Sequence, residues 1–367
     1  MNAHIINCDE TEFFNSFRPS GYLGVKVGIG GITPQALSKS CRTIYSMQAD
    51  MKTIREGDII FVHAGKKIYG AFKAATEFSE TPDTPPYFLS KNIHYFPNPN
   101  DPNSGWRDND SIRPNATGYY RHIAITHYVD EKGNNLCFEN GIQSTEVFEI
   151  KRRKKIWSIP ERWKYTDAAR TVRPLMADEA FELLKIIHRA NADNPDRLTV
   201  ESADFDDYLP IQFILDDRIV TNEKIIEGWV LENIGRNSDL DDALGPFSSF
   251  GNNMPAGYLK FMDIFGYQQL STGMKIYKVV EIKKDECSFP DDINQLIGYT
   301  NWVTQNIASG DYKSVEAAII AKSFDEDCTN FVANFNTTGN NIRLIHFDYT
   351  PPNYDSLDIL RVVCIGA

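Results

Sequence analysis

The sequence predicts a two-domain protein of the α/β (α+β) class, with a small β-rich barrel at the N-terminus and a mixed sheet flanked by helices at the C-terminus. Three observations indicate this fold class. The chain has 367 residues, enough for two domains of ordinary size. Short β-branched runs bounded by glycine and asparagine fill much of the first part. Helical and strand patterns alternate in the last part.

The composition is that of a globular protein, with 42% hydrophobic and 12% aromatic residues. No run of about 18 apolar residues occurs, so we expect no transmembrane helix and no membrane partner. The first residues, MNAHIINCDETEFF, lack a basic stretch followed by an apolar run, so we expect no secretory signal and a cytoplasmic location. The 6 cysteines lack zinc-site spacing and are expected to be buried free thiols.

The net charge argues against one class of nucleic-acid binder. Lysine and arginine total 38 against 50 aspartates and glutamates, a formal charge of −12. Such a chain is no broad polycation that coats nucleic acid. A local basic patch, or metal ions held by carboxylates, would still allow it to bind nucleic acid.

The first predicted domain spans residues 1–165. Its strands are bounded by turn residues, with turns near 64–67 and 132–135. The Pro-, Asn- and Asp-rich stretch 81–114 reads as a long surface loop. The predicted strands lie at residues 59–63, 68–76, 119–128 and 143–150.

A helical linker is predicted over residues 166–215. Within it, LMADEAFELLKIIHRANAD has apolar residues at helical spacing, including Ala180, Leu184 and Ile187. Stretches containing proline and aspartate flank this helix on both sides, so we interpret it as a connection between two domains.

The second predicted domain, residues 216–367, contains a possible metal site. Side chains alternate along a strand, so Glu281 and Lys283 project from the same face of the predicted strand 275–284. Asp263 lies on a preceding short strand and can meet Glu281 across an antiparallel pair. Two carboxylates suit Mg²⁺, which prefers hard oxygen ligands. Lys283 would then orient a water or stabilise developing charge.

Helices are expected on both sides of this strand pair. A helix from about Asp291 places Gln295 and Tyr299 four residues apart on one face. An upstream helix carries Glu223 and Glu227 with the same spacing. A strand at 317–321, a helix at 325–334 and a strand at 342–348 complete an α/β order with an antiparallel entry.

This pattern of an aspartate, ExK and a following QxxxY helix resembles the PD-(D/E)xK nuclease superfamily, most closely its RecB-like branch with the NucS-type endonucleases. The resemblance covers roughly residues 217–349. It implies that Asp263 and Glu281 bind Mg²⁺ or Mn²⁺ and that Lys283 is the catalytic lysine. The chain departs from the family pattern at Met262, where a proline would directly precede the aspartate.

The same resemblance implies further site residues. Gln295 and Tyr299 would lie beside the site, and a glutamate of the first helix, Glu227 or Glu223, would join it. The competing interpretation is a salt-bridged pair on an edge strand with an unrelated aspartate and ordinary helix-surface residues. A second ExK, Glu149 to Lys151, has no QxxxY helix after it and is interpreted as a surface strand end.

The N-terminal segment REGDIIFVHAGKKIYGAFKAATEF resembles PUA-like barrels, the group that includes EVE domains, over roughly residues 22–150. Gly57, Asp58 and Gly70 are its clearest points. The resemblance implies a module that receives a nucleic-acid base, which needs aromatic stacking surfaces. Most of the aromatic candidates are expected to pack the barrel instead; they are Tyr69, Phe72, Trp106, Tyr119 and Tyr120. Trp106 differs from the others because it lies in a polar loop where packing does not obviously require it.

The strongest basic cluster is the run KRRKK, which is expected to contact phosphates unless it is a solvated strand end. Its residues are Lys151, Arg152, Arg153, Lys154 and Lys155.

Together these patterns predict a Mg²⁺- or Mn²⁺-dependent DNA endonuclease, with a modification-dependent restriction or phage-defence role by analogy of architecture. Two alternatives stay open: a repair endonuclease of branched or mismatched DNA, and a non-catalytic nucleic-acid-binding protein with a degenerate nuclease fold. Cutting of both strands with one site per chain would favour a homodimer.

Overall fold

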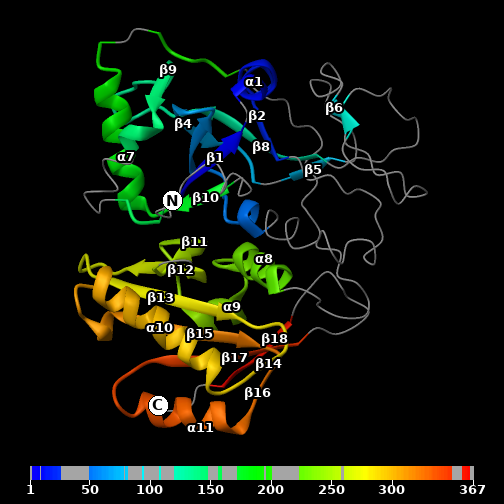
Figure 1. The fold of residues 1–367 in the computed structure, drawn as a ribbon, viewed down its shortest axis with the longest axis vertical. Coiled ribbons are helices and arrows are strands. Elements are labelled where there is room, and N and C mark those ends of the chain that lie inside the picture. The colour runs from blue at the N-terminus through cyan, green and yellow to red at the C-terminus, as the bar shows by residue number, and fades with distance from the viewer. Residues whose placement is uncertain are drawn as a thin grey trace. The chain divides into compact units, whose positions relative to one another are not determined.

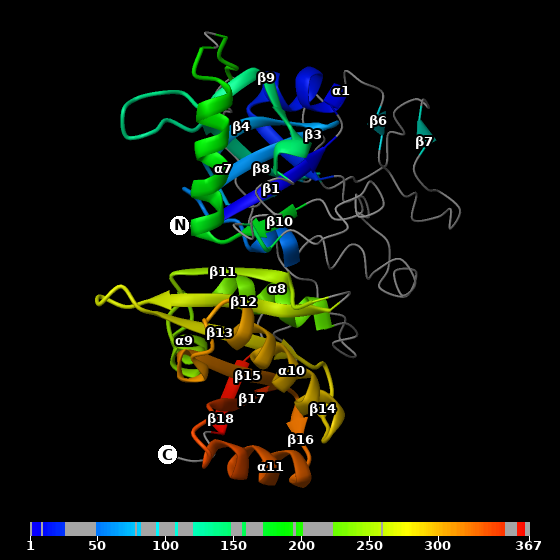
Figure 2. The ribbon, with the colours of Figure 1, turned by 60° about the vertical axis from the view of Figure 1, so that its left-hand side comes forward.

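Two large mixed β-sheets organise the chain, one in each of two units (Figures 1 and 2). The computed structural model describes residues 2–8, 10–25, 49–77, 79–81, 93–94, 107–108, 120–147, 156–158, 172–193, 196–200, 223–257, 260–348 and 358–363. Unit 1 comprises Met1–Trp157 and Trp163–Gln212, and unit 2 comprises Ser158–Arg162 and Phe213–Ala367. Sheets and helices in both units agree with the predicted mixed α and β class.

Unit 1 is built on a sheet in which most neighbouring strands are antiparallel. Its strands are β1 (Ala3–Cys8), β2 (Tyr22–Val25), β3 (Ile59–Ala64), β4 (Lys67–Ala74), β5 (Ser79–Thr81), β8 (Tyr120–His127), β9 (Cys137–Gln143) and β10 (Val172–Leu175). The order is β10-β1-β3-β4-β8-β2, with β5 beside β8 and β9 beside β4. Only the β1–β3 pair is parallel among the described pairings of this sheet.

Shorter elements complete unit 1. A separate two-stranded sheet consists of β6 (Ile93–His94) and β7 (Arg107–Asp108). After β1 the chain forms α1 (Glu10–Glu12), the π-helix η1 (Phe13–Phe17) and α2 (Arg18–Ser20). Phe13 and Phe17 of η1 are buried in the core with Tyr69 and Phe72 of β4. This aromatic packing anchors the short helical segment to the sheet.

The glycine and aspartate of the first-domain motif have structural explanations. Gly70 has φ +118° on β4, and a Cβ there would lie 2.3 Å from the Leu136 carbonyl oxygen, so only glycine fits. Asp58 is buried and accepts hydrogen bonds from the backbone N–H groups of Asn2 (2.7 Å) and Arg55 (2.9 Å). Burial alone would raise the pKa of Asp58, but His4 Nε2, 3.1 Å away, helps to lower it overall.

One predicted strand of unit 1 is shifted. The sequence indicated a strand at 143–150, but β9 ends at Gln143 and residues 144–147 form a helical turn. β9 itself, CFENGIQ, contains glycine and asparagine and has a weak strand pattern. It forms because it pairs with β4, from Lys67 opposite Gln143 to Gly70 opposite Cys137. Pairing in the tertiary structure overrides local propensity here.

The helix that we expected in a linker belongs to unit 1. α7 (Ala177–Ala190) buries Ala180, Leu183, Leu184 and Ile187 and packs against β4 and β9. Just before it, β10 pairs antiparallel with β1. The predicted linker 166–215 therefore differs from the structure, because an amphipathic helix lowers its free energy by burying its apolar face on a nearby sheet.

Unit 2 has a sheet that begins antiparallel and continues parallel. Its main strands are β11 (Ser249–Pro255), β12 (Phe261–Gln269), β13 (Lys275–Ile282), β15 (Val315–Ala321), β17 (Ile342–Asp348) and β18 (Asp358–Val363). They are ordered β11-β12-β13-β15-β17-β18. β11, β12 and β13 form an antiparallel meander, β13, β15 and β17 are parallel, and β18 is antiparallel to β17. The predicted antiparallel entry is confirmed.

Helices connect and cover this sheet. They are α8 (Glu223–Asn233), α9 (Ser238–Leu244), α10 (Asp291–Asn306) and α11 (Glu326–Asn336), with a 3₁₀ turn η3 (Tyr312–Ser314) and the short parallel pair β14 (Glu286–Cys287) and β16 (Ser323–Phe324). α10 packs on β13 and β15, and α8 packs on β13. Within the described ranges, no helix is long and apolar enough to span a bilayer.

Two charged side chains of β13 are buried, on opposite faces of the strand as the predicted alternation requires. Lys278 and Glu281 are both buried and, three residues apart on a strand, project from opposite faces. The Lys278 ammonium donates to the Leu244 carbonyl oxygen at 2.5 Å, at the end of α9. Lys278 therefore stabilises the C-terminus of a helix on one face of the sheet. The Glu281 side chain lies on the opposite face.

Candidate active site

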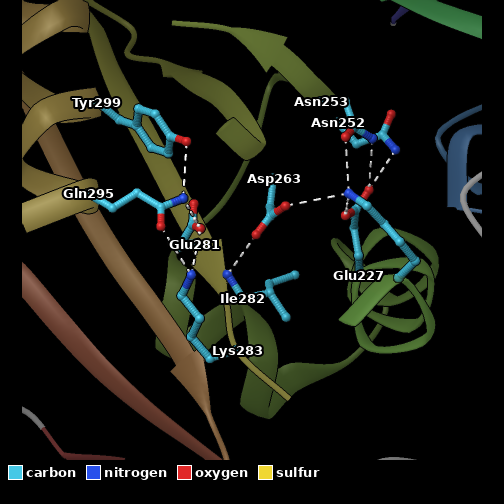
Figure 3. Close-up of polar contacts among 10 residues, drawn as sticks. Glu227, Asn252, Asn253, Asp263, Glu281, Ile282, Lys283, Gln295 and Tyr299 are labelled. Carbon is cyan, nitrogen blue, oxygen red and sulfur yellow. Dashed lines mark hydrogen bonds and ion pairs between the residues drawn. The ribbon is translucent and has the colours of Figure 1, made fainter. Parts of the chain in front are cut away.

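Asp263 and Glu281 are brought together by the β12–β13 pairing. The last paired residues of this ladder are Ile264 and Val280, so extending the register by one step places Asp263 opposite Glu281. The Asp263 Oδ2 atom accepts the backbone N–H of Ile282 at 3.0 Å. This hydrogen bond fixes the carboxylate at the end of the strand pair (Figure 3).

Glu281 is a buried carboxylate with only one oxygen hydrogen-bonded. The residue is 3% exposed. Its Oε1 atom accepts from Gln295 Nε2 at 2.6 Å and from Lys283 Nζ at 3.1 Å. Its Oε2 atom is buried and has no hydrogen-bond partner in the described part of the chain. Burial, and then the charge of Asp263, raise the pKa of Glu281 well above its ordinary value, although Lys283 opposes the rise.

Lys283 is held by three oxygen atoms on two elements. Its ammonium lies 3.1 Å from Glu281 Oε1, 3.2 Å from Gln295 Oε1 and 3.3 Å from Asp292 Oδ1. Burial would lower the pKa of Lys283, but the charges of Glu281 and Asp292 raise it overall. The group therefore stays protonated and can act as a cation and hydrogen-bond donor, not as a base.

The helix α10 supplies the predicted pair Gln295 and Tyr299. One turn of helix separates them, and Gln295 Nε2 donates to the Tyr299 hydroxyl at 3.0 Å as well as to Glu281. Figure 3 shows both residues on one side of Glu281, pointing toward it. Gln295 is thus the side chain that joins Glu281, Lys283 and Tyr299.

Glu227 of α8 lies on the other side of Asp263 and has no exposed surface. Its Oε1 atom accepts from Asn252 Nδ2 at 2.7 Å and from Asn253 Nδ2 at 3.3 Å, both on β11. Its Oε2 atom forms an ion pair with Lys224. Burial raises the pKa of Glu227 to about 7, and Lys224 only partly opposes this.

Glu223, one turn earlier on α8, also faces this region. Burial and the charge of Asp263 raise its pKa, while Lys283 and a hydrogen bond from the Lys284 backbone N–H oppose the rise. The two glutamates that the sequence could not separate therefore have different surroundings. Glu227 is enclosed by Asn252, Asn253 and Lys224, whereas Glu223 is partly exposed and lies close to the Asp263 and Lys283 side.

Four residues of the cluster were not predicted from the sequence. Lys224 and Asp292 lie on α8 and α10, the two helices that carry predicted site residues. Asn252 and Asn253 lie on a strand that carried no functional signal. Conversely, Trp106 and the basic run 151–155 lie outside the described residues.

The donor set can be compared with the needs of a divalent metal ion. Across the part of the chain that the structure describes, no group of three or more His, Cys, Asp or Glu side chains has the arrangement of a complete metal site. Two carboxylates are present, and the partnerless Oε2 atom of Glu281 is a buried acceptor that a cation would satisfy. Asp263 and Glu281 thus fit an ion that keeps several water ligands, such as Mg²⁺ or Mn²⁺.

The chain is similar to solved structures of two DNA complexes, each at low sequence identity. No family model matches the sequence, and no curated protein matches it. One similar solved structure is EndoMS in complex with double-stranded DNA, at 14% identity and a TM-score of 0.25, covering 48% of this chain and 55% of that one. Another is human THYN1 in complex with DNA that contains 5-methylcytosine, at 13% identity and a TM-score of 0.27, covering 51% of this chain and 98% of that one. The chain thus spans about half the length of the first of these.

Proposed function

We propose that this protein is a DNA endonuclease that depends on Mg²⁺ or Mn²⁺. The observation that carries the proposal is the buried, partnerless Oε2 atom of Glu281, next to Asp263 and a charged Lys283. A buried carboxylate oxygen without a hydrogen-bond partner is costly, and ionisable groups in such surroundings concentrate at functional sites. A carboxylate pair with an adjacent cation suits the hydrolysis of a phosphodiester, which has to stabilise added negative charge.

Each residue has a separate task in this proposal. Asp263 and Glu281 would hold the metal ion, which when bound lowers the pKa of water and neutralises phosphate charge. The Lys283 ammonium would exchange one of its three present acceptors for a phosphate oxygen. Water adds to phosphorus and gives up a proton to the solvent, while the P–O ester bond breaks and the leaving oxygen takes a proton from the solvent. Gln295 holds the Lys283 and Glu281 side chains in position relative to each other, because it contacts both. Tyr299 fixes the Gln295 amide in turn.

We extend the proposal to unit 1 through its likeness in sequence to PUA-like and EVE domains. In this extension unit 1 reads a feature of the DNA, such as a modified base, and the protein acts in modification-dependent restriction. The buried, hydrogen-bonded Asp58 and the close approach of the Leu136 carbonyl to Gly70 support an ordered scaffold for such a module. A repair endonuclease would instead cleave unmodified branched or mismatched DNA.

Cleavage of plasmid DNA and of modified phage DNA, with and without Mg²⁺ or Mn²⁺, tests the proposal. We expect metal-dependent cutting by the wild type, and a loss of about 100-fold or more in Asp263→Ala and Glu281→Gln. Asp285→Asn is the matched control, because this exposed carboxylate lies just beyond the same strand. Full cutting by Glu281→Gln would contradict the assignment. No cutting of any substrate would favour the non-catalytic binding protein.

A further inference from the structure

The ammonium of Lys224 lies where three elements of unit 2 converge. It contacts Asn253 Oδ1 of β11 at 3.0 Å and Asp263 Oδ1 of β12 at 3.4 Å. It also forms the ion pair with Glu227 Oε2 within α8. Figure 3 shows Glu227 and Asn253 on the side of Asp263 away from Glu281.

The three acceptor atoms are oxygens of the kind that bind cations. An ammonium has three N–H donors and no acceptor, and here it is surrounded by two carboxylate oxygens and one amide oxygen. Oxygens of this kind are also the ligands that divalent cations such as Mg²⁺ take. The Lys224 side chain is only 19% exposed, so its interactions are screened less than those of a surface lysine.

The surrounding structure holds this cluster in place. The Asn252 and Asn253 amides donate to the second oxygen of Glu227, so that both of its oxygens are bonded. Asn253 has φ 49°, in the left-handed region that non-glycine residues seldom adopt. On the far side of Asp263, by contrast, the Glu281 Oε2 atom has no partner among the described residues. One side of the centre is therefore closed by a lysine and the other has an open carboxylate oxygen.

We propose that Lys224 is a positioning residue that takes the place of a second divalent cation, so that the centre binds a single metal ion on the Asp263–Glu281 side. This inference rests on the proposed function. Lys224 acts through Asp263, whose Oδ1 atom it holds while the Ile282 N–H holds Oδ2. The buried Glu227 is the counter-ion that keeps the Lys224 ammonium at this point.

A simpler role for Lys224 would be to neutralise the buried Glu227. The two roles differ when both charges are removed together. Neutralisation alone predicts that Lys224→Met/Glu227→Gln behaves as the wild type, because no buried charge is left unpaired. A positioning role predicts a folded double variant whose Asp263 has lost its cationic partner.

Mn²⁺ binding to the full-length protein without DNA, followed by calorimetry and electron paramagnetic resonance, tests the inference. The wild type and Lys224→Arg should bind a single Mn²⁺ per chain. Lys224→Met should gain a second ion, because three oxygens lose their cation. Lys224→Met/Glu227→Gln should keep single-ion binding with an affinity lowered by about 10-fold. Lys284→Met, a more exposed lysine just beyond β13, is the control and should match the wild type.

Each contrary result has one meaning. If Lys224→Met does not fold without metal, the double variant alone decides, and wild-type affinity there overturns the inference. Unchanged stoichiometry in a folded Lys224→Met, or two ions in the wild type, also overturns it while leaving the nuclease proposal intact. A wild type that binds no Mn²⁺ overturns both.

Discussion

At the scale of single residues, the site concentrates charge where water is excluded. Glu227 has no exposed surface and Glu281 has almost none, yet both are carboxylates. Each is compensated by a lysine, Lys224 for the first and Lys283 for the second. Asp263 lies between these two pairs. Because burial raises the pKa of both glutamates, the folded state resists their ionisation, and part of the stability of unit 2 depends on pH.

Glu227 gives a prediction for this pH dependence. Its pKa in the folded state is raised to about 7, above the ordinary value of 4.5. The folded state therefore binds the proton more tightly, and the associated stability is full below about pH 4.5 and is lost as pH rises through about 7. Glu227→Gln cannot ionise, so its melting temperature should increasingly exceed, or fall less below, that of the wild type from pH 5 to pH 8.

Thermal unfolding of both proteins in EDTA across this pH range measures the effect. The difference between the two proteins should grow most up to about pH 7, where Glu227 is ionised in the unfolded state and still protonated in the folded state. Asp285→Asn is the control, because it removes an exposed carboxylate. Its melting temperature relative to the wild type should not change with pH in this way. If the melting temperature of Glu227→Gln instead falls relative to that of the wild type as pH rises, the charge of Lys224 outweighs the effect of burial on the pKa of Glu227.

At the scale of elements, α10 organises the side of the site that faces Glu281. Its residue Gln295 contacts both Glu281 and Lys283, whereas Tyr299 reaches them only through Gln295. The helix also contributes Asp292 to Lys283 from its first turn. The crossover from β13 through α10 to the parallel strand β15 thus fixes the orientation of these side chains relative to the strand that bears Glu281.

Substitutions on α10 should separate these contacts. Gln295→Ala removes one donor from Glu281 and one acceptor from Lys283, and we expect it to lower the single-turnover cleavage rate by about 10-fold. Tyr299→Phe should have a smaller effect, because it removes only the hydroxyl that accepts from Gln295. Asn294→Ala, at an exposed position on the same helix, is the control. A Tyr299→Phe effect larger than that of Gln295→Ala would contradict this order.

At the scale of the whole molecule, the distribution of charge determines whether DNA is attracted or repelled. A chain of net charge −12 is repelled by DNA unless positive charge is gathered locally. The run 151–155 places five basic residues in succession. Phosphate contacts by such residues release counter-ions, which makes DNA affinity fall with salt concentration.

Neutralising Lys151–Lys155 with glutamine should therefore weaken DNA binding and flatten its salt dependence. The slope of log affinity against log salt should fall by roughly 0.9 for each phosphate contact that is lost. Fluorescence anisotropy with a labelled duplex, measured in Ca²⁺ to prevent cleavage, gives both quantities. Replacing Lys132, Lys185 and Lys284 instead removes exposed charges outside the run. An unchanged slope after neutralising the run would mean that it does not contact DNA.

Features that depend on local periodicity could be predicted from the sequence. Side chains alternate along a strand, which was enough to place Glu281 and Lys283 on one face and Lys278 on the other. The four-residue spacing of Gln295 and Tyr299 was likewise enough to place them on one face of a helix. The strand 342–348 and the start of the helix at Asp291 were also predicted as they are found.

Which of these elements contact one another depends on long-range packing, which local patterns do not encode. α7 packs against unit 1 and is not a connector, and β9 exists because β4 pairs with it. Lys224, Asn253 and Asp263 come from three elements and are joined through one nitrogen atom. No local pattern encodes such a cluster, because its contacts depend on strand register and helix docking between residues up to 39 positions apart.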